Sequence, residues 1–202
     1  MTRRLVLLRH GRTPWNHEGR VQGHRDVGLD DVGHAQAAAV APVVAKLSPA
    51  QLWCSDLERA RQTVAPVAVA CGLEPRYDER LREFGFGDLE GRTHTELAAD
   101  APDDFTALRR GDYHRISTAE PLAQVRARMA SALGELLGLL EADQTGVALS
   151  HGAAIRVAVG ELLGWPAEQF GTLGGLPNCT WAELAENPVT GRLQLVALGR
   201  GA

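Results

Sequence analysis

Short apolar runs that stop abruptly at polar residues predict the strands of this chain. Residues 3–8 are rich in Leu and Val and stop at Arg9-His10-Gly11, and residues 146–149 stop in the same way at Ser150-His151-Gly152. Continuous apolar runs of this length are typical of strands that are buried on both faces of a parallel sheet. Three further runs predict strands, the last two as a closing pair: residues 51–54, 180–184 and 193–198.

Helical patterns separate these strands. Apolar residues at three- and four-residue spacing between positions 122 and 140 predict a long amphipathic helix. Further helices are expected from Asp30 to about 47, from Asp56 to about 71, and over 153–163. We expect Asp30 and Asp56 to act as N-caps, Pro42 to bend or shorten the first helix, and Gly72 to close the second.

Strands that alternate with helices predict an α/β fold, a three-layer α/β/α sandwich with a mostly parallel central sheet. At 202 residues the chain is near the upper size of one compact domain, so we expect a single domain over residues 1–202. Open α/β sheets bind ligands at the carboxyl ends of their strands. The polar, glycine-containing segment 9–28 begins at such an end, whereas residues 75–92 predict an irregular, glycine-rich stretch.

The amino-acid composition limits the classes of partner that we expect for the protein. With 45% hydrophobic residues, 23% charged residues and a net charge of −4, the chain has no polybasic segment, so we expect neither nucleic acid nor membrane as a partner. Its first apolar run is too short for a secretory signal and no run is long enough to span a bilayer, which predicts a cytoplasmic protein. Three cysteines in mostly apolar surroundings predict reduced thiols without a disulfide.

Two of the seven histidines are distinguished by their positions. His10 and His151 each follow a predicted strand and precede a glycine, so their rings could face one another across a pocket at one edge of the sheet. The remaining five are interpreted as structural: His17, His24, His34, His94 and His114.

Phosphoryl transfer fits the groups that surround these histidines. It requires an in-line nucleophile and cations for the equatorial phosphate oxygens. Arg9 and Arg59 are the candidate clamp, because a guanidinium donates two parallel hydrogen bonds to paired oxygens. A leaving alkoxide needs a proton, and the apolar neighbours of Glu83 are expected to raise the pKa of its carboxyl and so keep a proton there.

Five ordered blocks of sequence together resemble the histidine phosphatase superfamily, the phosphoglycerate-mutase-like group. They are residues 7–16 (LLRHGRTPWN), 22–23 (QG), 55–60 (SDLERA), 81–91 (LREFGFGDLEG) and 150–152 (SHG). The resemblance implies that His10 attacks phosphorus to give a phosphohistidine and that Glu83 is the general acid, then the base toward water. It implies further that Arg9, Arg59 and His151 hold the phosphoryl group, and that the substrate is contacted by Gly11, Thr13, Asn16, Gln22, Gly23 and Gly152. Neither a metal nor another cofactor is implied.

The resemblance leaves the substrate open. Arg12 stands where relatives often carry Glu or Gln, and residues 118–121 (TAEP) stand where many carry Gly-Gly-Glu-Ser. Cofactor-dependent phosphoglycerate mutases would share the site, but they are typically longer, and the short segment 92–120 favours a phosphatase. Residues 93–95 and 173–181 are similar to those of glucosyl-3-phosphoglycerate phosphatases, so sugar phosphates or phosphoglycerate derivatives are the expected substrates. A catalytically inactive phosphometabolite-binding protein is the second alternative.

Other hydrolase classes do not fit. Cysteine phosphatases need Cys-x5-Arg, whereas only four residues separate Cys54 from Arg59, and no third metal ligand accompanies His10 and His151 at a recognisable spacing. A homodimer through the last strands stays open. So does the question of which arginines line the pocket mouth and which face solvent: Arg20, Arg25, Arg109, Arg110 and Arg115.

Overall fold

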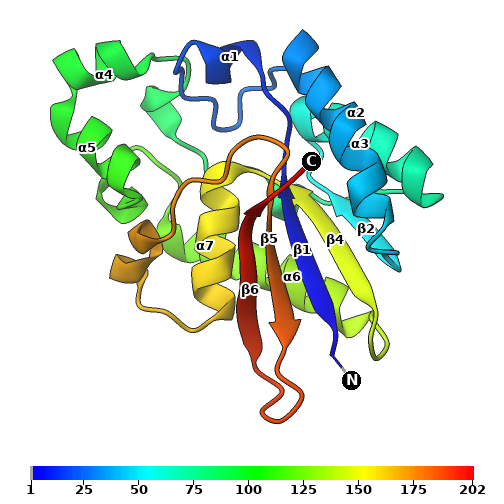
Figure 1. Ribbon diagram of the computed structural model, residues 1–202. Helices are drawn as coiled ribbons and strands as arrows, with labels where there is room; N and C mark the ends of the chain where they lie inside the picture. The colour runs from blue at the N-terminus through cyan, green and yellow to red at the C-terminus, as the bar shows by residue number, and fades with distance from the viewer. Residues whose placement is uncertain (1) are drawn as a thin grey trace.

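The computed structural model describes residues 2–202 and contains a six-stranded sheet with helices on both faces (Figure 1). Its strands are β1 (Arg4–Arg9), β2 (Gln51–Cys54), β3 (Arg76–Tyr77), β4 (Thr145–Ser150), β5 (Trp181–Glu186) and β6 (Leu193–Arg200). They lie in the order β3-β2-β4-β1-β5-β6. All neighbours pair in parallel except β5, which is antiparallel to both β1 and β6. The predicted α/β/α sandwich with a mostly parallel sheet is therefore confirmed.

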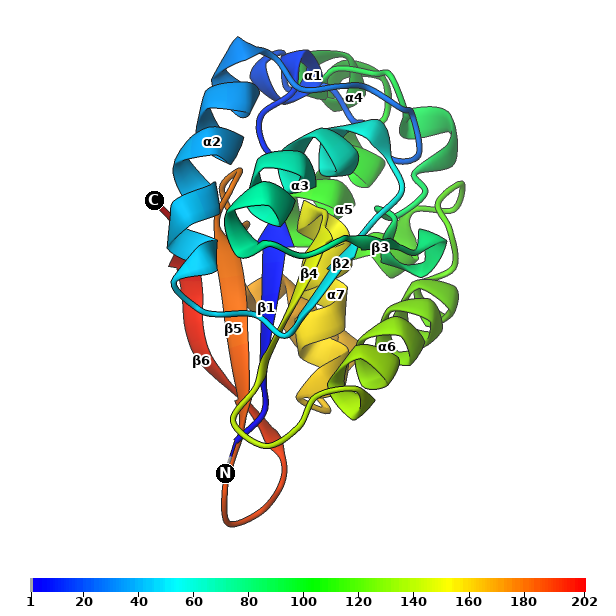
Figure 2. The same cartoon turned by 90° about the vertical axis from the view of Figure 1, so that its right-hand side faces the viewer.

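Helices cover both faces of this sheet (Figure 2). The α-helices of the described residues are α1 (Pro14–His17), α2 (Asp31–Ala45), α3 (Glu58–Cys71), α4 (His94–Asp100), α5 (Pro102–Arg110), α6 (Leu122–Gly138) and α7 (Gly152–Leu162). Four 3₁₀ turns complete them: Glu79–Leu81, Gly87–Leu89, Tyr113–Arg115 and Ala167–Thr172. No helix within residues 2–202 is long and apolar enough to cross a membrane.

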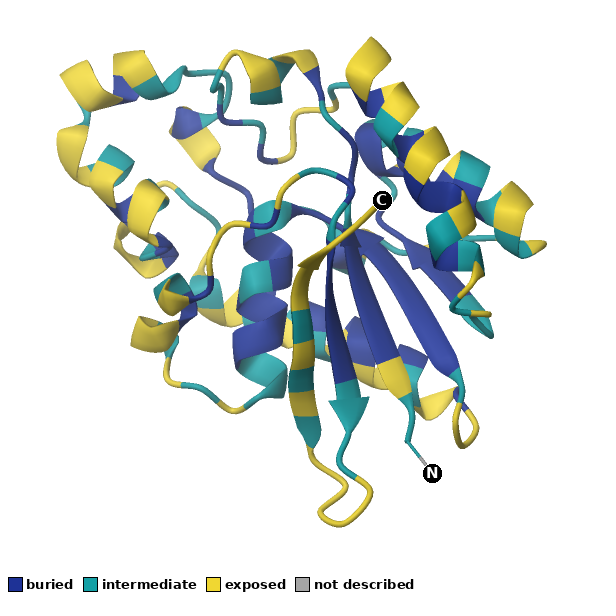
Figure 3. Ribbon diagram, viewed as in Figure 1, coloured by how far each residue is buried: buried dark blue, intermediate teal, exposed yellow. Residues whose placement is uncertain are grey.

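Strand β1 illustrates how the sequence divides the core between the two faces. Side chains of a strand alternate between faces. Leu5 and Leu7 accordingly join the apolar cluster of α6 and α7, while Val6 and Leu8 join that of α2 and α3. All four are almost completely buried. Figure 3 shows the same burial along the central strands, whereas β6 at the edge is partly exposed.

Several expected boundaries hold, and two details differ. Asp30 caps α2 by accepting a hydrogen bond from the Gly33 N–H, as predicted. Pro42 lies inside α2 without ending it, because the helix continues to Ala45. Asp56 does not cap α3, since its carboxylate forms an ion pair with Arg82 instead.

At the ends and connections of the helices, one further expectation holds and one difference appears. Gly72 closes α3 with a left-handed φ of 66°, as expected of a C-terminal glycine. Helices α4 and α5 were not expected, because both are short and mostly polar: each buries a single residue, Leu97 in α4 and Ala107 in α5. They lie beyond the carboxyl ends of the strands, near α1 (Figure 1).

The register of the sheet places the two strand-end histidines beside each other. Strands β1 and β4 are parallel neighbours, and Arg9 is paired with Ser150. The residues that follow, His10 and His151, therefore leave the sheet side by side, and their ring centroids are 5.1 Å apart. The expectation that the two rings meet at one edge of the sheet is confirmed.

Candidate active site

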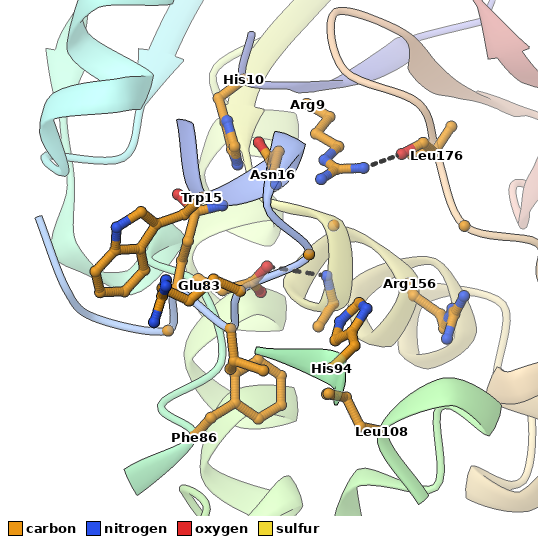
Figure 4. Close-up of a pocket in the computed structure, with 18 of the residues that line it drawn as sticks. Arg9, His10, Trp15, Asn16, Glu83, Phe86, His94, Leu108, Arg156 and Leu176 are labelled. Carbon is orange, nitrogen blue, oxygen red and sulfur yellow. Dashed lines mark hydrogen bonds between the residues drawn. The ribbon is translucent and has the colours of Figure 1, made fainter. Parts of the chain in front are cut away.

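A cavity of about 260 Å³ opens at the carboxyl ends of β1 and β4 (Figure 4). Its wall includes most of the residues expected there: Arg9, His10, Asn16, Gln22, Gly23, Arg59, Glu83 and Gly152. Of the expected set, Gly11, Thr13 and His151 do not belong to its lining. The cavity thus brings together candidate site residues that lie in five separate segments of the sequence.

His10 presents a nucleophilic nitrogen to this cavity. Its Nδ1 lies 2.7 Å from the Gly11 carbonyl oxygen, which can only accept, so Nδ1 carries the proton of a neutral ring and Nε2 keeps its lone pair. Burial, together with the positive charges of Arg59 and Arg9, holds the pKa of His10 well below its ordinary value. A neutral imidazole with a free Nε2 is the form required for attack on phosphorus.

His151 lies behind His10 rather than in the wall. It is completely buried, and its Nδ1 accepts a hydrogen bond from Arg59 Nε at 3.1 Å. Its Nε2 therefore carries the proton and donates to Ser55 Oγ at 2.8 Å. Burial, Arg59 and His10 all keep the pKa of His151 well below its ordinary value, so this ring too is neutral.

Arg59 is a fully buried cation held at three nitrogen atoms. Besides its bond to His151, Nη1 donates to the Arg25 carbonyl and Nη2 to the Gly23 carbonyl, at 2.9 and 2.8 Å. Burial lowers the pKa of Arg59 to about 10, which leaves it charged at neutral pH. Because each Nη carries a second N–H, the guanidinium both fixes the loop around Gly23 and retains donors for an anion.

Arg9 and Asn16 add donors on the other side of His10. Arg9 Nη1 donates to the Leu176 carbonyl, whereas its buried Nε has no hydrogen-bond partner within residues 2–202. Asn16 Oδ1 accepts from the Thr13 N–H and from Asn178 Nδ2, which leaves its own amide N–H groups for the cavity. Both side chains are therefore suited to bind phosphate oxygens.

Thr13 and Gly11 support the wall from behind. Thr13 is completely buried, and its hydroxyl donates to Gln22 Oε1 at 3.0 Å, so it positions the Gln22 amide. Gly11 serves a packing purpose, not a close approach to ligand. A Cβ on Gly11 would lie 2.7 Å from the Gly33 carbonyl oxygen, so the missing side chain lets the chain after His10 pass against the first turn of α2.

Glu83 is held by backbone N–H groups. Its Oε1 accepts from the N–H groups of Phe84 and Ala154, both at 2.8 Å, and its Oε2 accepts from Ala153 at 3.2 Å. The side chain thus turns to the N-terminus of α7, while Phe86 and Tyr113 line the same cavity. Oε2, with a single protein donor, is the oxygen with capacity left for a proton.

Sequence reasoning missed several residues of the wall. Trp15, Phe86, His94, Tyr113 and Arg156 line the cavity, and His94 in particular was interpreted as structural. Trp15 and Phe86 lie within two of the family-like blocks and His94 within the segment 93–95, but no site role was assigned to them, and Tyr113 and Arg156 occur in none of the quoted motifs. They come from segments whose contact with His10 depends on the tertiary fold.

The five uncertain arginines separate into groups. Arg20 and Arg109 line the cavity, whereas Arg110 and Arg115 line a separate surface depression near the end of α5. Arg25 is mostly exposed and faces Glu90. The positions that depart from the family pattern, Arg12 and the segment 118–121, do not belong to the cavity lining, and Arg12 pairs with Asp30.

Comparison with known proteins identifies the family. The model of the histidine phosphatase superfamily (branch 1) matches residues 5–198. The chain belongs to the histidine phosphatase superfamily. The glucosyl-3-phosphoglycerate phosphatase of Mycobacterium tuberculosis is 36% identical over 190 residues, which cover 91% of this chain and 85% of that protein. A relative from Erwinia tasmaniensis, named as a probable phosphoglycerate mutase GpmB, is 37% identical over 177 residues, with 87% and 81% covered.

Solved structures of histidine phosphatases agree with this assignment. The mycobacterial glucosyl-3-phosphoglycerate phosphatase in complex with inorganic phosphate has a TM-score of 0.88, 34% sequence identity and 98% coverage of each chain. The protein is a metal-independent histidine phosphatase, a phosphomonoester hydrolase. Within residues 2–202, no group of three or more His, Cys, Asp or Glu side chains is arranged to hold a metal ion.

Proposed function

We propose that this histidine phosphatase hydrolyses phosphomonoesters of small metabolites through a phosphohistidine on His10. One observation carries the proposal. His10 is neutral, its Nε2 is free of hydrogen bonds to the protein in the described residues, and it lies in a cavity beside the guanidinium groups of Arg9 and Arg59. An uncharged nucleophile between two cations is suited to attack a phosphoryl dianion.

In the first step, His10 Nε2 forms a bond to phosphorus while the bond from phosphorus to the ester oxygen breaks. Arg9, Arg59 and the Asn16 amide neutralise the equatorial oxygens. A proton on Glu83 Oε2 passes to the leaving oxygen, so the alcohol departs neutral and Glu83 becomes a carboxylate. His151 acts from behind the wall: it accepts from Arg59 Nε and thereby fixes the orientation of that guanidinium.

In the second step, a water molecule attacks the phosphohistidine. Glu83 accepts the proton of this water, the bond from Nε2 to phosphorus breaks, and inorganic phosphate leaves. His10 returns to its neutral form and Glu83 to its protonated form. The nucleophile His10 and the acid–base residue Glu83 therefore serve both half-reactions.

Sugar phosphates and phosphoglycerate derivatives are the substrates we propose. The relatives named as glucosyl-3-phosphoglycerate phosphatases support this class, because the chain covers most of their length. Phosphoglycerate mutase activity is the alternative, supported by the relative named GpmB. In a mutase the phosphohistidine would transfer to a second metabolite instead of to water.

The test measures inorganic phosphate released from a panel of phosphomonoesters in excess chelator. We expect release by the wild-type protein and none by His10→Ala, while His17→Ala, which alters an exposed histidine on α1, keeps the wild-type rate. Acid-labile radioactive phosphate on the wild-type protein, and not on His10→Ala, would identify the intermediate. Equal release by His10→Ala would refute the proposal. Transfer to 3-phosphoglycerate without release would favour the mutase.

A cytoplasmic location belongs to the same proposal. Cys54, Cys71 and Cys179 are all free thiols, as suits a reducing compartment. The oligomeric state, with a homodimer as one open possibility, is to be determined by sedimentation, and the predicted single domain over residues 1–202 is to be checked by a single cooperative unfolding transition.

A further inference from the structure

The cavity contains a second unsatisfied cation besides the clamp at His10. Within residues 2–202, four buried side-chain nitrogen atoms have no hydrogen-bond partner. Two are indole nitrogens, of Trp53 and Trp181, and the other two are the Nε atoms of Arg9 and Arg156, which both line the cavity. Buried polar atoms in native proteins are nearly always paired. Two guanidinium groups with incomplete hydrogen bonding thus line one cavity, which suits a ligand with two groups of acceptors.

Arg156 is held firmly in its place by neighbours that do not neutralise it. It projects from α7, and its Nη1 donates to the Tyr113 hydroxyl at 3.1 Å. Burial raises the pKa of Tyr113 to about 12, so the phenol stays uncharged. Gly111 makes room for the guanidinium, because a Cβ there would lie 2.5 Å from Nη1.

No carboxylate of the described chain pairs with Arg156. It takes part in none of the ion pairs formed within residues 2–202. The carboxylate of the described cavity wall, Glu83, is instead held by the backbone of α7 and Phe84. A half-buried guanidinium without an anion has lost part of its hydration and gained no ion pair in return.

The other outer arginines of the cavity differ from Arg156 in this respect. Arg20 is already engaged, since its Nε donates to Glu18 and its Nη1 to the Gly91 carbonyl. Arg109 lies exposed on α5, where water can solvate it. Arg156 is therefore the outer cation that gains most from an anion of the substrate.

Arg156 also lies close enough to the phosphoryl clamp for one small molecule to reach both. The pKa of Arg9 is lowered by burial and, among smaller causes, by the positive charge of Arg156. Figure 4 shows Arg156 extending from α7 among the residues that surround Glu83 and Arg9. A metabolite with a phosphoryl group at His10 thus brings its remaining atoms near Arg156.

We infer that Arg156, held by Tyr113, binds a carboxylate that the substrate carries in addition to its phosphoryl group. The inference rests on the proposed function, because that function places the phosphoryl group at His10. It narrows the substrate class to phosphorylated hydroxy acids and their glycosides, in preference to neutral sugar phosphates. The planar fork of a guanidinium matches a carboxylate with two parallel hydrogen bonds.

Two substrates that differ only at the inferred group provide the test. 3-Phosphoglycerate and glycerol 3-phosphate are alike except that a carboxylate in the first is a hydroxymethyl group in the second. We expect Arg156→Gln to lower kcat/KM for 3-phosphoglycerate about 10- to 100-fold, the range for a hydrogen-bonded charged group, and to change that for glycerol 3-phosphate less than about 3-fold. Arg115→Gln, outside the cavity, is the matched control and is expected to change neither.

A second variant keeps the inference testable if Arg156→Gln folds poorly. Tyr113→Phe retains the ring and removes only the hydroxyl that holds Nη1, so we expect a smaller loss confined to 3-phosphoglycerate and expressed in KM. Equal losses on both substrates, or a wild-type enzyme without preference for 3-phosphoglycerate, would overturn the inference while leaving the phosphatase proposal intact. No phosphate release from any ester, including 4-nitrophenyl phosphate, would overturn both.

Discussion

Acidification should destabilise this protein through its two buried histidines. Both His10 and His151 have pKa values well below the ordinary value of 6.5, with burial as the largest cause. In the unfolded chain the same imidazoles take up protons as the pH falls through 6.5, whereas in the folded protein they do not. The unfolded state therefore binds more protons below that pH, and the free energy of unfolding decreases.

The size of the effect follows from the proton uptake of the unfolded chain. A histidine that titrates near 6.5 when unfolded and stays neutral when folded lowers the free energy of unfolding by about 1.4 kcal/mol between pH 7.5 and 5.5. The two histidines together lower it by about 2.7 kcal/mol. This is a large share of the stability of a typical domain, about 5–15 kcal/mol.

Urea unfolding at pH 7.5 and 5.5, in a buffer without phosphate, measures this decrease. His10→Asn should reduce the decrease by about 1.4 kcal/mol, because one of the two titrating groups is gone. Val40→Ala is the control: it opens a cavity at a fully buried position and lowers stability at both pH values without changing their difference. If His10→Asn shows the wild-type decrease, His10 is protonated in the folded protein and the reasoning fails.

Three substitutions test other parts of the structure. Arg59→Ala should lower kcat/KM about 10²- to 10³-fold, with the exposed Arg61→Ala of the same helix unchanged, and a near-normal rate would remove Arg59 from the mechanism. Glu83→Gln should slow alkyl phosphates far more than 4-nitrophenyl phosphate, since an aryl oxide leaves without a proton; equal slowing would argue against its role as acid. Gly160→Ala should cost about 1–3 kcal/mol in urea unfolding, because its Cβ would lie 2.2 Å from the Phe170 ring, and unchanged stability would contradict that packing.

The groups nearest to phosphorus could be predicted from the sequence because local patterns determine them. A strand that stops at a histidine fixes where that histidine lies, and the parallel neighbours β1 and β4 then bring His10 and His151 together. Arg9 shares this position at the end of β1, whereas Arg59 on α3 was predicted from its sequence block, and contacts with His151 and Gly23 hold it in the site.

The supporting contacts could not be predicted because they join residues far apart in sequence. Arg156 and Tyr113 are 43 positions apart, and Tyr113 lies in a segment with no clear periodicity. Asp56 resembled a helix cap, but Arg82, 26 positions later, offers a charged partner that outweighs a terminal N–H group. At such positions tertiary contacts override the local propensity of the sequence.

The segment after Leu176 holds the residues around His10 in place, so the site is ordered only when the whole chain has folded. Asn178 Nδ2 donates to the His10 carbonyl across 168 positions of sequence and also to Asn16 Oδ1, while the Cys179 N–H reaches the Arg9 and His10 carbonyls. Cys179 adopts a positive φ of 54° to do so, a conformation that only a finished tertiary structure sustains. A chain in which this long loop has not closed lacks these contacts. A partly folded chain therefore lacks the ordered nucleophile, and enzymatic activity reports on the integrity of the whole sheet.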